Sequence, residues 1–242
     1  MLWCLHGFLG RGEDWDPLRA SWPADLPPLR TPDLFAAPPR DDSLPAFGER
    51  FAAETAAADQ APCLLGYSLG GRLALHALLA RPASWRGAVI VSTHLGLSDK
   101  PARATRLADD AIWTRRFRED PWETVMRDWN ARDVFGGREQ TLPRDEARYD
   151  RAALAHALDA WSLGRQDDLA PRLAALTVPI LWIAGANDRR YVTQGKRAAG
   201  AARSVTFLQA PGAAHRVPWE AAAWFTETVA GFVRGAVERL SG

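Results

Sequence analysis

The sequence predicts an α/β fold with a mostly parallel sheet of about six strands flanked by helices. Short apolar runs recur along the 242 residues, and stretches with helical spacing separate them. Runs that stay apolar without alternating are typical of strands covered by helices on both faces. The length suits one α/β domain. The expected strands lie at residues 2–5, 62–66, 87–91, 178–184 and 204–208, with a further candidate at 29–33.

Residues 98–170 break this alternation because they contain no good strand. They are rich in Arg, Asp, Ala and Trp, and their apolar residues recur at helical spacing. A segment of about seventy residues is too long for one crossover between strands. We therefore expect a helical cap, inserted after the strand at 87–91, over a core formed by residues 1–97 and 171–242. The cap is expected to be an insertion rather than an independent domain.

The charged residues are nearly balanced, with 30 Lys and Arg against 29 Asp and Glu and a formal net charge of +1. Nucleic acids and membrane surfaces favour a basic patch, so neither is expected as a partner. No apolar run approaches a membrane span, and the first residues indicate a strand rather than a signal peptide. These features predict a cytoplasmic protein. Cys4 and Cys63 lie in apolar runs, which favours small core residues over a disulfide or a metal pair.

The strongest local signal is the G-x-S-x-G pattern Gly66-Tyr67-Ser68-Leu69-Gly70. An apolar strand precedes it and a helical run follows, which is the context of a sharp strand-to-helix turn that exposes a reactive serine. Glycine suits the two ends of the pattern, because a Cβ there would clash. Ser68 would lie at a helix N-terminus, where the dipole favours developing negative charge. An ordinary glycine turn is the alternative interpretation.

The first expected strand leads directly into His6-Gly7-Phe8-Leu9-Gly10. On a sheet with such a serine turn, this is the usual position of the second donor to an oxyanion. The backbone N–H groups of Phe8 and Leu69 are therefore expected to point at one spot and to stabilise negative charge there. His6 itself is interpreted as a structural residue that holds the loop, rather than as a proton shuttle.

Asp188 and His215 each follow an expected strand, in the Ser–Asp–His order that this topology requires. His215 would take the proton of Ser68, and Asp188 would fix the tautomer and stabilise the imidazolium. A turn aspartate and a surface histidine are the alternatives, and Asp33 lies too early for this order. The sequence contains neither a clustered Cys/His ligand set nor a G-x-G-x-x-G pattern, so no metal or organic cofactor is expected.

Four stretches of the chain resemble one family. They are Gly66–Arg72, Ser92–Leu97, Arg103–Phe117 with Asp128, Trp129 and Phe135, and Ser162–Gly164 with Gln166–Leu169. In these stretches the sequence is similar to the 2-succinyl-6-hydroxy-2,4-cyclohexadiene-1-carboxylate (SHCHC) synthases of menaquinone biosynthesis, which have the α/β-hydrolase fold. The resemblance extends from Leu5 to about Phe225.

The resemblance implies a lyase that eliminates pyruvate from a polycarboxylate precursor. Ser68 would then act as a base toward a substrate C–H rather than as an acylated nucleophile. Planar guanidinium groups suit carboxylates, so arginines are expected to line the pocket of this anionic small molecule. The residues that the resemblance places around the substrate are Arg72, Arg106 and Arg148, with Tyr67 and Trp129 as walls.

Two other functions stay open. The same three side chains suit a hydrolase of esters, thioesters or C–C bonds, in which Ser68 is a covalent nucleophile or activates water. A binding protein without catalytic activity is the third class, although such proteins usually lose a member of the triad. The sequence does not indicate an oligomeric state.

Overall fold

A computed structural model describes residues 1–35, 43–138 and 142–238. The six strands described form one sheet in the order β2-β1-β3-β4-β5-β6, and every neighbouring pair is parallel. The strands are β1 (Leu2–Leu5), β2 (Leu29–Arg30), β3 (Cys63–Tyr67), β4 (Gly87–Val91), β5 (Ile180–Gly185) and β6 (Val205–Ala210). The predicted parallel sheet is confirmed.

Prolines account for two of the shifted strand boundaries. β3 and β5 begin later than expected, at Cys63 and Ile180, because Pro62 and Pro179 precede them. A proline has no N–H to donate to a strand ladder. The candidate strand at 29–33 is reduced to the two residues of β2, which lie at the edge of the sheet. β6 runs further at its end than the sequence indicated.

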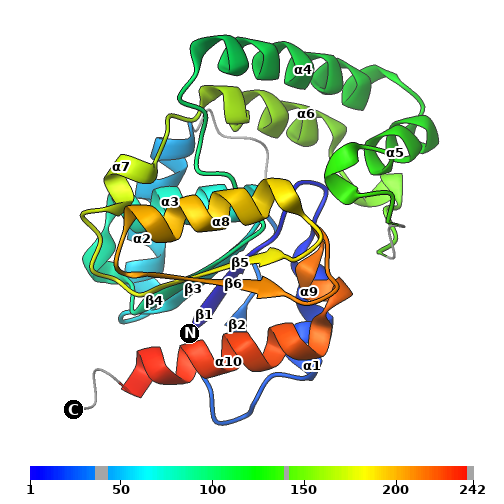
Figure 1. Cartoon of the computed structure of the whole chain (residues 1–242). Helices are drawn as coiled ribbons and strands as arrows, with labels where there is room; N and C mark the ends of the chain where they lie inside the picture. The colour runs from blue at the N-terminus through cyan, green and yellow to red at the C-terminus, as the bar shows by residue number, and fades with distance from the viewer. Residues whose placement is uncertain (36–42, 139–141, 239–242) are drawn as a thin grey trace.

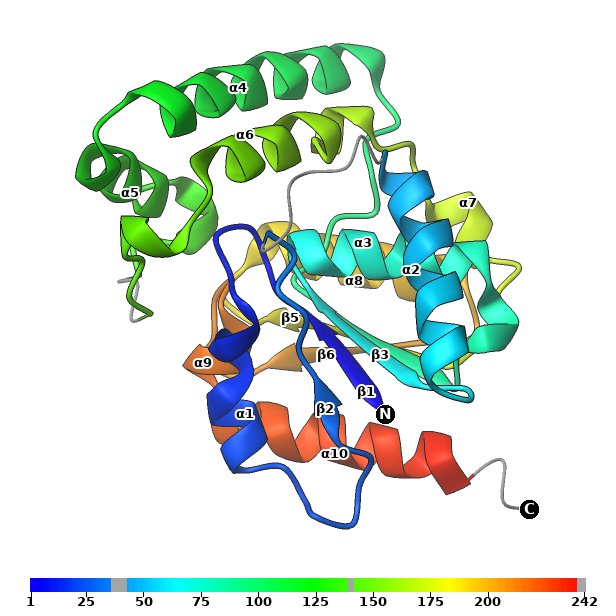
Figure 2. The same ribbon diagram turned by 180° about the vertical axis from the view of Figure 1, so that it is seen from behind.

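Helices cover both faces of the sheet, as Figures 1 and 2 show from opposite sides. On one face lie α2 (Leu44–Ala58), α3 (Leu69–Ala80) and α8 (Arg189–Ala201), and on the other lie α1 (Asp16–Ala20) and α10 (Ala222–Glu238). The shorter elements outside the cap are η1 (Gly12–Trp15), η2 (Pro82–Ser84), α7 (Ala170–Leu173) and α9 (Val217–Glu220). Alternate side chains of β3 and β4 join two separate apolar clusters, one shared with α2 and α3 and the other with α10.

Between β4 and β5 the described residues form helices and no strand. They are α4 (Lys100–Glu119), α5 (Trp122–Asn130) and α6 (Arg151–Ala160), with 3-10 turns η3 (Asp133–Phe135), η4 (Glu146–Arg148) and η5 (Leu163–Arg165), and the short α7 that leads to β5. We name α4, α5 and α6 the cap helices. In both views they lie beyond α3 and α8, on the side away from α10 (Figures 1 and 2). The division of the chain into core and cap at residues 98 and 170 stays a prediction. None of the helices in the described ranges combines the length and apolarity that a membrane crossing requires.

Cys4 and Cys63 are buried on the neighbouring strands β1 and β3, and neither forms a disulfide. Burial raises the pKa of the Cys4 thiol, so this cysteine is not a thiolate nucleophile at neutral pH. The prediction that both are small core residues is confirmed.

Gly70 lies where α3 passes close to β1, and Gly70→Ala is expected to destabilise the protein. A Cβ at Gly70 would lie 2.2 Å from the carbonyl oxygen of Leu5 and 2.4 Å from that of His6. Both are backbone atoms, so the helix itself would have to shift. We expect a loss of about 3 kcal/mol in the free energy of unfolding, measured by urea denaturation.

Gly231→Ala is the matched control for this substitution. Gly231 lies within α10, and an added Cβ there has nothing within 4 Å. The control is expected to gain about 0.5–1 kcal/mol, because alanine loses less conformational entropy in a helix. A Gly70→Ala protein as stable as the wild type would contradict the close approach of α3 to β1.

Candidate active site

The turn between β3 and α3 holds Ser68 in a strained backbone conformation. Ser68 has φ 54° and ψ −111°, a region that residues other than glycine rarely adopt. Its N–H donates to the Val91 carbonyl of β4 at 2.9 Å, and α3 begins at the next residue. A Cβ at Gly66 would lie 2.5 Å from the Gly70 carbonyl oxygen, so the turn tolerates only glycine there. This strained conformation is the one expected of a sharp strand-to-helix turn that exposes a single side chain.

The three residues predicted as a triad form a chain of two contacts, with His215 between Ser68 and Asp188. His215 Nε2 lies 3.1 Å from Ser68 Oγ, and His215 Nδ1 lies 3.0 Å from Asp188 Oδ2. Asp188 Oδ1 also accepts from the N–H of Tyr191, at the first turn of α8. His215 is 2% exposed and Asp188 is 7% exposed, so water screens their interaction little. This geometry allows a serine proton to pass to an imidazole that a carboxylate orients.

His6 holds the loop that carries the expected oxyanion donor. Its Nε2 accepts from the N–H of Leu34 at 2.9 Å, so the ring proton lies on Nδ1 and donates to the Gly7 carbonyl at 2.9 Å. The Gly7 carbonyl and the Phe8 N–H belong to one peptide plane and point in opposite directions. The bond from His6 therefore fixes the direction of the Phe8 N–H. The other expected donor is the N–H of Leu69, the first residue of α3, which no carbonyl of the same helix accepts.

One cavity contains most of the predicted site residues. It is lined by Ser68 and His215 together with Phe8, Leu69, Tyr67, Trp129, Arg72 and Arg106. The rings of Tyr67 and Tyr191 flank His215, with centroids 5.5 Å and 4.6 Å from the imidazole centroid. The structure thus brings the serine, the histidine and two of the three expected arginines to the wall of the same space.

Arg72 and Arg106 are held by different kinds of partner. Arg72 is 8% exposed and donates to two neutral acceptors, the Trp161 carbonyl at 2.7 Å and Gln166 Oε1 at 3.3 Å. Burial, and then the charge of Arg106, lower the pKa of Arg72 to about 10. Arg106 donates from Nε to both oxygens of the buried Asp110, at 2.9 Å each. Asp110 is the one carboxylate residue among the described residues that line the cavity.

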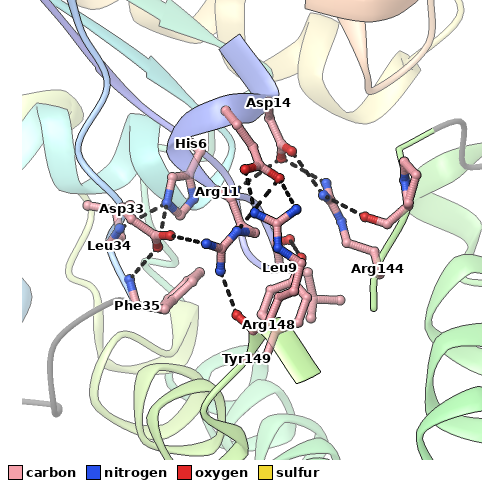
Figure 3. Close-up of polar contacts among 12 residues, drawn as sticks. His6, Leu9, Arg11, Asp14, Asp33, Leu34, Phe35, Arg144, Arg148 and Tyr149 are labelled. Atoms are coloured by element: carbon pink, nitrogen blue, oxygen red, sulfur yellow. Dashed lines mark hydrogen bonds and ion pairs between the residues drawn. The ribbon is translucent and has the colours of Figure 1, made fainter. Parts of the chain in front are cut away.

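Arg148 does not line this cavity, so the structure does not support its expected contact with the substrate. Figure 3 shows it turned toward the loop after β1. Both of its terminal nitrogens donate to Glu13, and its backbone carbonyl accepts from Arg11. The carboxylate of Glu13, in the core, binds the Arg148 guanidinium instead.

A network of polar contacts joins the segment around η4 to the loop after β1 (Figure 3). Arg144 donates to both oxygens of Asp14, at 2.9 Å and 2.8 Å, and both side chains are nearly buried. The Tyr149 hydroxyl donates to the Leu9 carbonyl at 2.9 Å. Because Leu9 directly follows Phe8, this network supports the same loop as His6 does.

Sequence reasoning gave no site role to several polar residues that line the cavity, among them His94, Arg132, Arg190 and Tyr191. Two of them had a usable signal, because His94 follows the end of β4 and Arg190 follows the end of β5, where ligands of parallel sheets bind. His94 Nδ1 accepts from the Gly96 N–H, so its proton lies on Nε2. Burial, followed by the charges of Arg190 and Arg72, lowers the pKa of His94 to about 3. His94 is therefore a neutral donor. Within the described ranges, no cluster of three or more His, Cys, Asp or Glu residues is suited to a metal ion.

Similarity to known proteins extends over most of this chain. The model of the alpha/beta hydrolase family matches residues 4–228. The 2-succinyl-6-hydroxy-2,4-cyclohexadiene-1-carboxylate synthase of Pectobacterium atrosepticum is 36% identical over 199 residues, covering 78% of this chain and 78% of that protein. The synthase of the same name from Serratia proteamaculans is 37% identical over 205 residues, covering 79% and 78%.

Solved structures show the same fold at lower identity. MenH from S. aureus has a TM-score of 0.86 at 21% identity, over 97% of this chain and 93% of that one. A hydrolase from Pseudomonas aeruginosa PA01 has a TM-score of 0.74 at 20% identity, over 96% and 89%. The chain therefore belongs to the α/β-hydrolase family, as an enzyme like the SHCHC synthases.

Proposed function

We propose that this enzyme eliminates pyruvate from a polycarboxylate precursor in menaquinone biosynthesis, with Ser68, His215 and Asp188 as its catalytic triad. The observation that carries this proposal is the charge of the cavity. Arg72, buried and bound only to neutral acceptors in the described part of the chain, lies in the wall beside Ser68 and His215. A buried guanidinium without a carboxylate partner favours an anionic ligand.

In the proposed reaction Ser68 acts as a base. His215 Nε2 takes the hydroxyl proton of Ser68 while Ser68 Oγ takes a proton from a substrate carbon. The electron pair of that C–H bond forms a C=C bond, and the C–O bond to the departing group breaks. The leaving oxygen takes a proton from the His215 imidazolium, and pyruvate leaves in its enol form. The N–H groups of Phe8 and Leu69 would stabilise negative charge on a conjugated carbonyl oxygen during proton removal.

The test of this function is an assay of pyruvate release. Purified protein is mixed with the menaquinone precursor, and lactate dehydrogenase with NADH reports pyruvate. Release that depends on enzyme and on Ser68 supports the proposal. Absence of pyruvate at any enzyme concentration contradicts it.

A hydrolase is the second candidate, because the hydrogen bond between Ser68 Oγ and His215 Nε2 also suits attack on a carbonyl. The two functions differ in the fate of the serine. A hydrolase gives a burst of product from an activated phenyl ester and an acyl group on Ser68 that mass spectrometry detects. The lyase releases pyruvate without acylating Ser68.

Arg106 is expected to bind a carboxylate of the substrate through its terminal nitrogens. Its Nε is engaged by Asp110, so removing Arg106 alone would leave a buried carboxylate without its cation. The prediction therefore concerns a double variant, Arg106→Ala with Asp110→Asn, which removes the buried charge together with its cation. The KM for the polycarboxylate should rise about 10- to 100-fold. Hydrolysis of a neutral phenyl ester, measured in parallel, should change by less than about threefold.

Asp110→Asn alone is the control for this pair. It keeps Arg106 and should retain a KM close to that of the wild type. Equal losses on the polycarboxylate and the neutral ester in the double variant would remove the argument for an anion pocket.

A further inference from the structure

Arg132 lines the cavity, but neither the sequence nor the proposed mechanism has given it a role. It lies between α5 and η3, three residues after Trp129. Its guanidinium carbon lies 4.6 Å from the ring centroid of Trp129 and 5.1 Å from that of Trp113. Two indole rings therefore hold the planar group in place before any ligand arrives, and a pre-ordered guanidinium loses little entropy on binding.

The charge of Arg132 has weak compensation within the described chain. Its Nη2 lies 3.9 Å from Asp109, whose side chain is 58% exposed. Its Nη1 is buried and has no hydrogen-bond partner among the described residues. Burial, and then the charge of Arg106, lower the pKa of Arg132. A buried donor without an acceptor is unfavourable, so a small side-chain movement toward an added anion would satisfy it.

The other arginines of the cavity show what distinguishes Arg132. Arg72 has two neutral acceptors, and Arg106 has Asp110. Arg190 also lines the cavity, but it is exposed to solvent, whereas Nη1 of Arg132 is buried without an acceptor among the described residues. Arg148, which the family resemblance placed at the substrate, is bound to Glu13 outside the cavity. A ligand with a third carboxylate therefore needs another guanidinium in the cavity wall.

We propose that Arg132 is a third carboxylate-binding residue of this cavity, beside Arg72 and Arg106. It sets the preference of the site for ligands with three carboxylates over ligands with two. This inference rests on the proposed function in one respect, because it takes the cavity to bind an anionic ligand.

Isothermal titration calorimetry tests the inference with two simple probes, propane-1,2,3-tricarboxylate and the dicarboxylate glutarate. Arg132→Gln should weaken binding of the tricarboxylate about 10- to 100-fold, as expected for loss of a charged hydrogen bond. Binding of glutarate should change by less than about threefold. Arg132→Lys keeps the charge but loses the planar fork, so it should lie between the wild type and Arg132→Gln.

Arg127→Gln is the matched control. Arg127 lies on α5, its side chain is 70% exposed, and it binds Asp128 rather than lining the cavity. The same change of net charge at that position should leave both titrations unaltered.

Three results would overturn the inference. The first is tricarboxylate binding by Arg132→Gln that equals that of the wild type. The second is an equal loss for both probes together with a lower melting temperature, which would make Arg132 a purely structural support for Trp129. The third is a wild-type protein that binds neither probe.

These titrations separate the inference from the proposed reaction. Binding that depends on Arg132 in a protein that releases no pyruvate would refute the reaction and leave the subsite intact. If the protein releases pyruvate but its tricarboxylate binding is unchanged in Arg132→Gln, the reaction is supported and the subsite is refuted.

Discussion

Ser68→Ala is expected to lower kcat for pyruvate release by at least about 1,000-fold. The hydroxyl oxygen lies 3.1 Å from His215 Nε2. Among the described residues, no other side-chain hydroxyl lies within hydrogen-bonding distance of that nitrogen. Removing the oxygen therefore removes the base and leaves the cavity and its arginines in place. KM should change little, because the substrate carboxylates keep their partners.

Ser68→Gly separates the chemistry from the backbone strain. Both variants lack the hydroxyl, so both should be inactive. Glycine accepts φ 54° without strain. The free energy of unfolding of Ser68→Gly should therefore be about 1 kcal/mol higher than that of Ser68→Ala. Circular dichroism and urea denaturation measure this difference. Retention of more than a tenth of wild-type kcat in Ser68→Ala would refute the assignment of Ser68 as the base.

Asp188→Asn is expected to lower kcat by about 1,000- to 10,000-fold. The carboxylate accepts from His215 Nδ1 at 3.0 Å in a site where both groups are almost buried. A neutral amide cannot stabilise the imidazolium that forms when His215 takes a proton, and it can present its NH₂ to Nδ1 and impose the wrong tautomer. Steady-state kinetics of pyruvate release measure the loss.

Asp99→Asn provides the matched control. Asp188 and Asp99 both cap the first turn of a helix, accepting from the N–H groups of Tyr191 and Ala102. Asparagine caps helices about as well as aspartate does, so neither variant should lose much stability. Asp99 lies outside the cavity, and its variant should keep wild-type kcat. An Asp188→Asn enzyme within tenfold of wild-type kcat would exclude Asp188 as the orienting carboxylate.

The fold could be predicted because its signals are local. Five apolar runs mark β1 and β3 to β6, and the residues of β1 and β3 to β5 are almost all buried, as expected for strands covered on both faces. β6 differs, because it lies at the edge of the sheet and has exposed residues. The two-residue β2 is shorter than predicted, and it pairs only with β1, through Leu29 and Arg30. The first residues of β3 and β5 could have been predicted correctly, because Pro62 and Pro179 lack the N–H that a strand ladder needs.

The candidate triad could also be predicted, because parallel strands place their carboxyl ends at one edge of a sheet. Ser68, Asp188 and His215 follow β3, β5 and β6, so the topology alone brings them near one another. Their separations of 3.0 Å and 3.1 Å depend on the loops that follow the strands, which the sequence pattern does not specify.

The sequence by itself therefore determined the sheet, the serine turn and the order of the three polar residues, since each follows from a short pattern on a regular scaffold. Only the tertiary structure decided which cap arginines face the cavity. Arg148 and Arg132 are both charged residues at turns beside cap helices, and no spacing rule separates them. Glu13 of the core binds Arg148 outside the cavity, while Trp113 and Trp129 pack against Arg132 in the cavity wall. The direction of a long side chain is set by the partners that packing brings to it, and those partners come from distant parts of the chain.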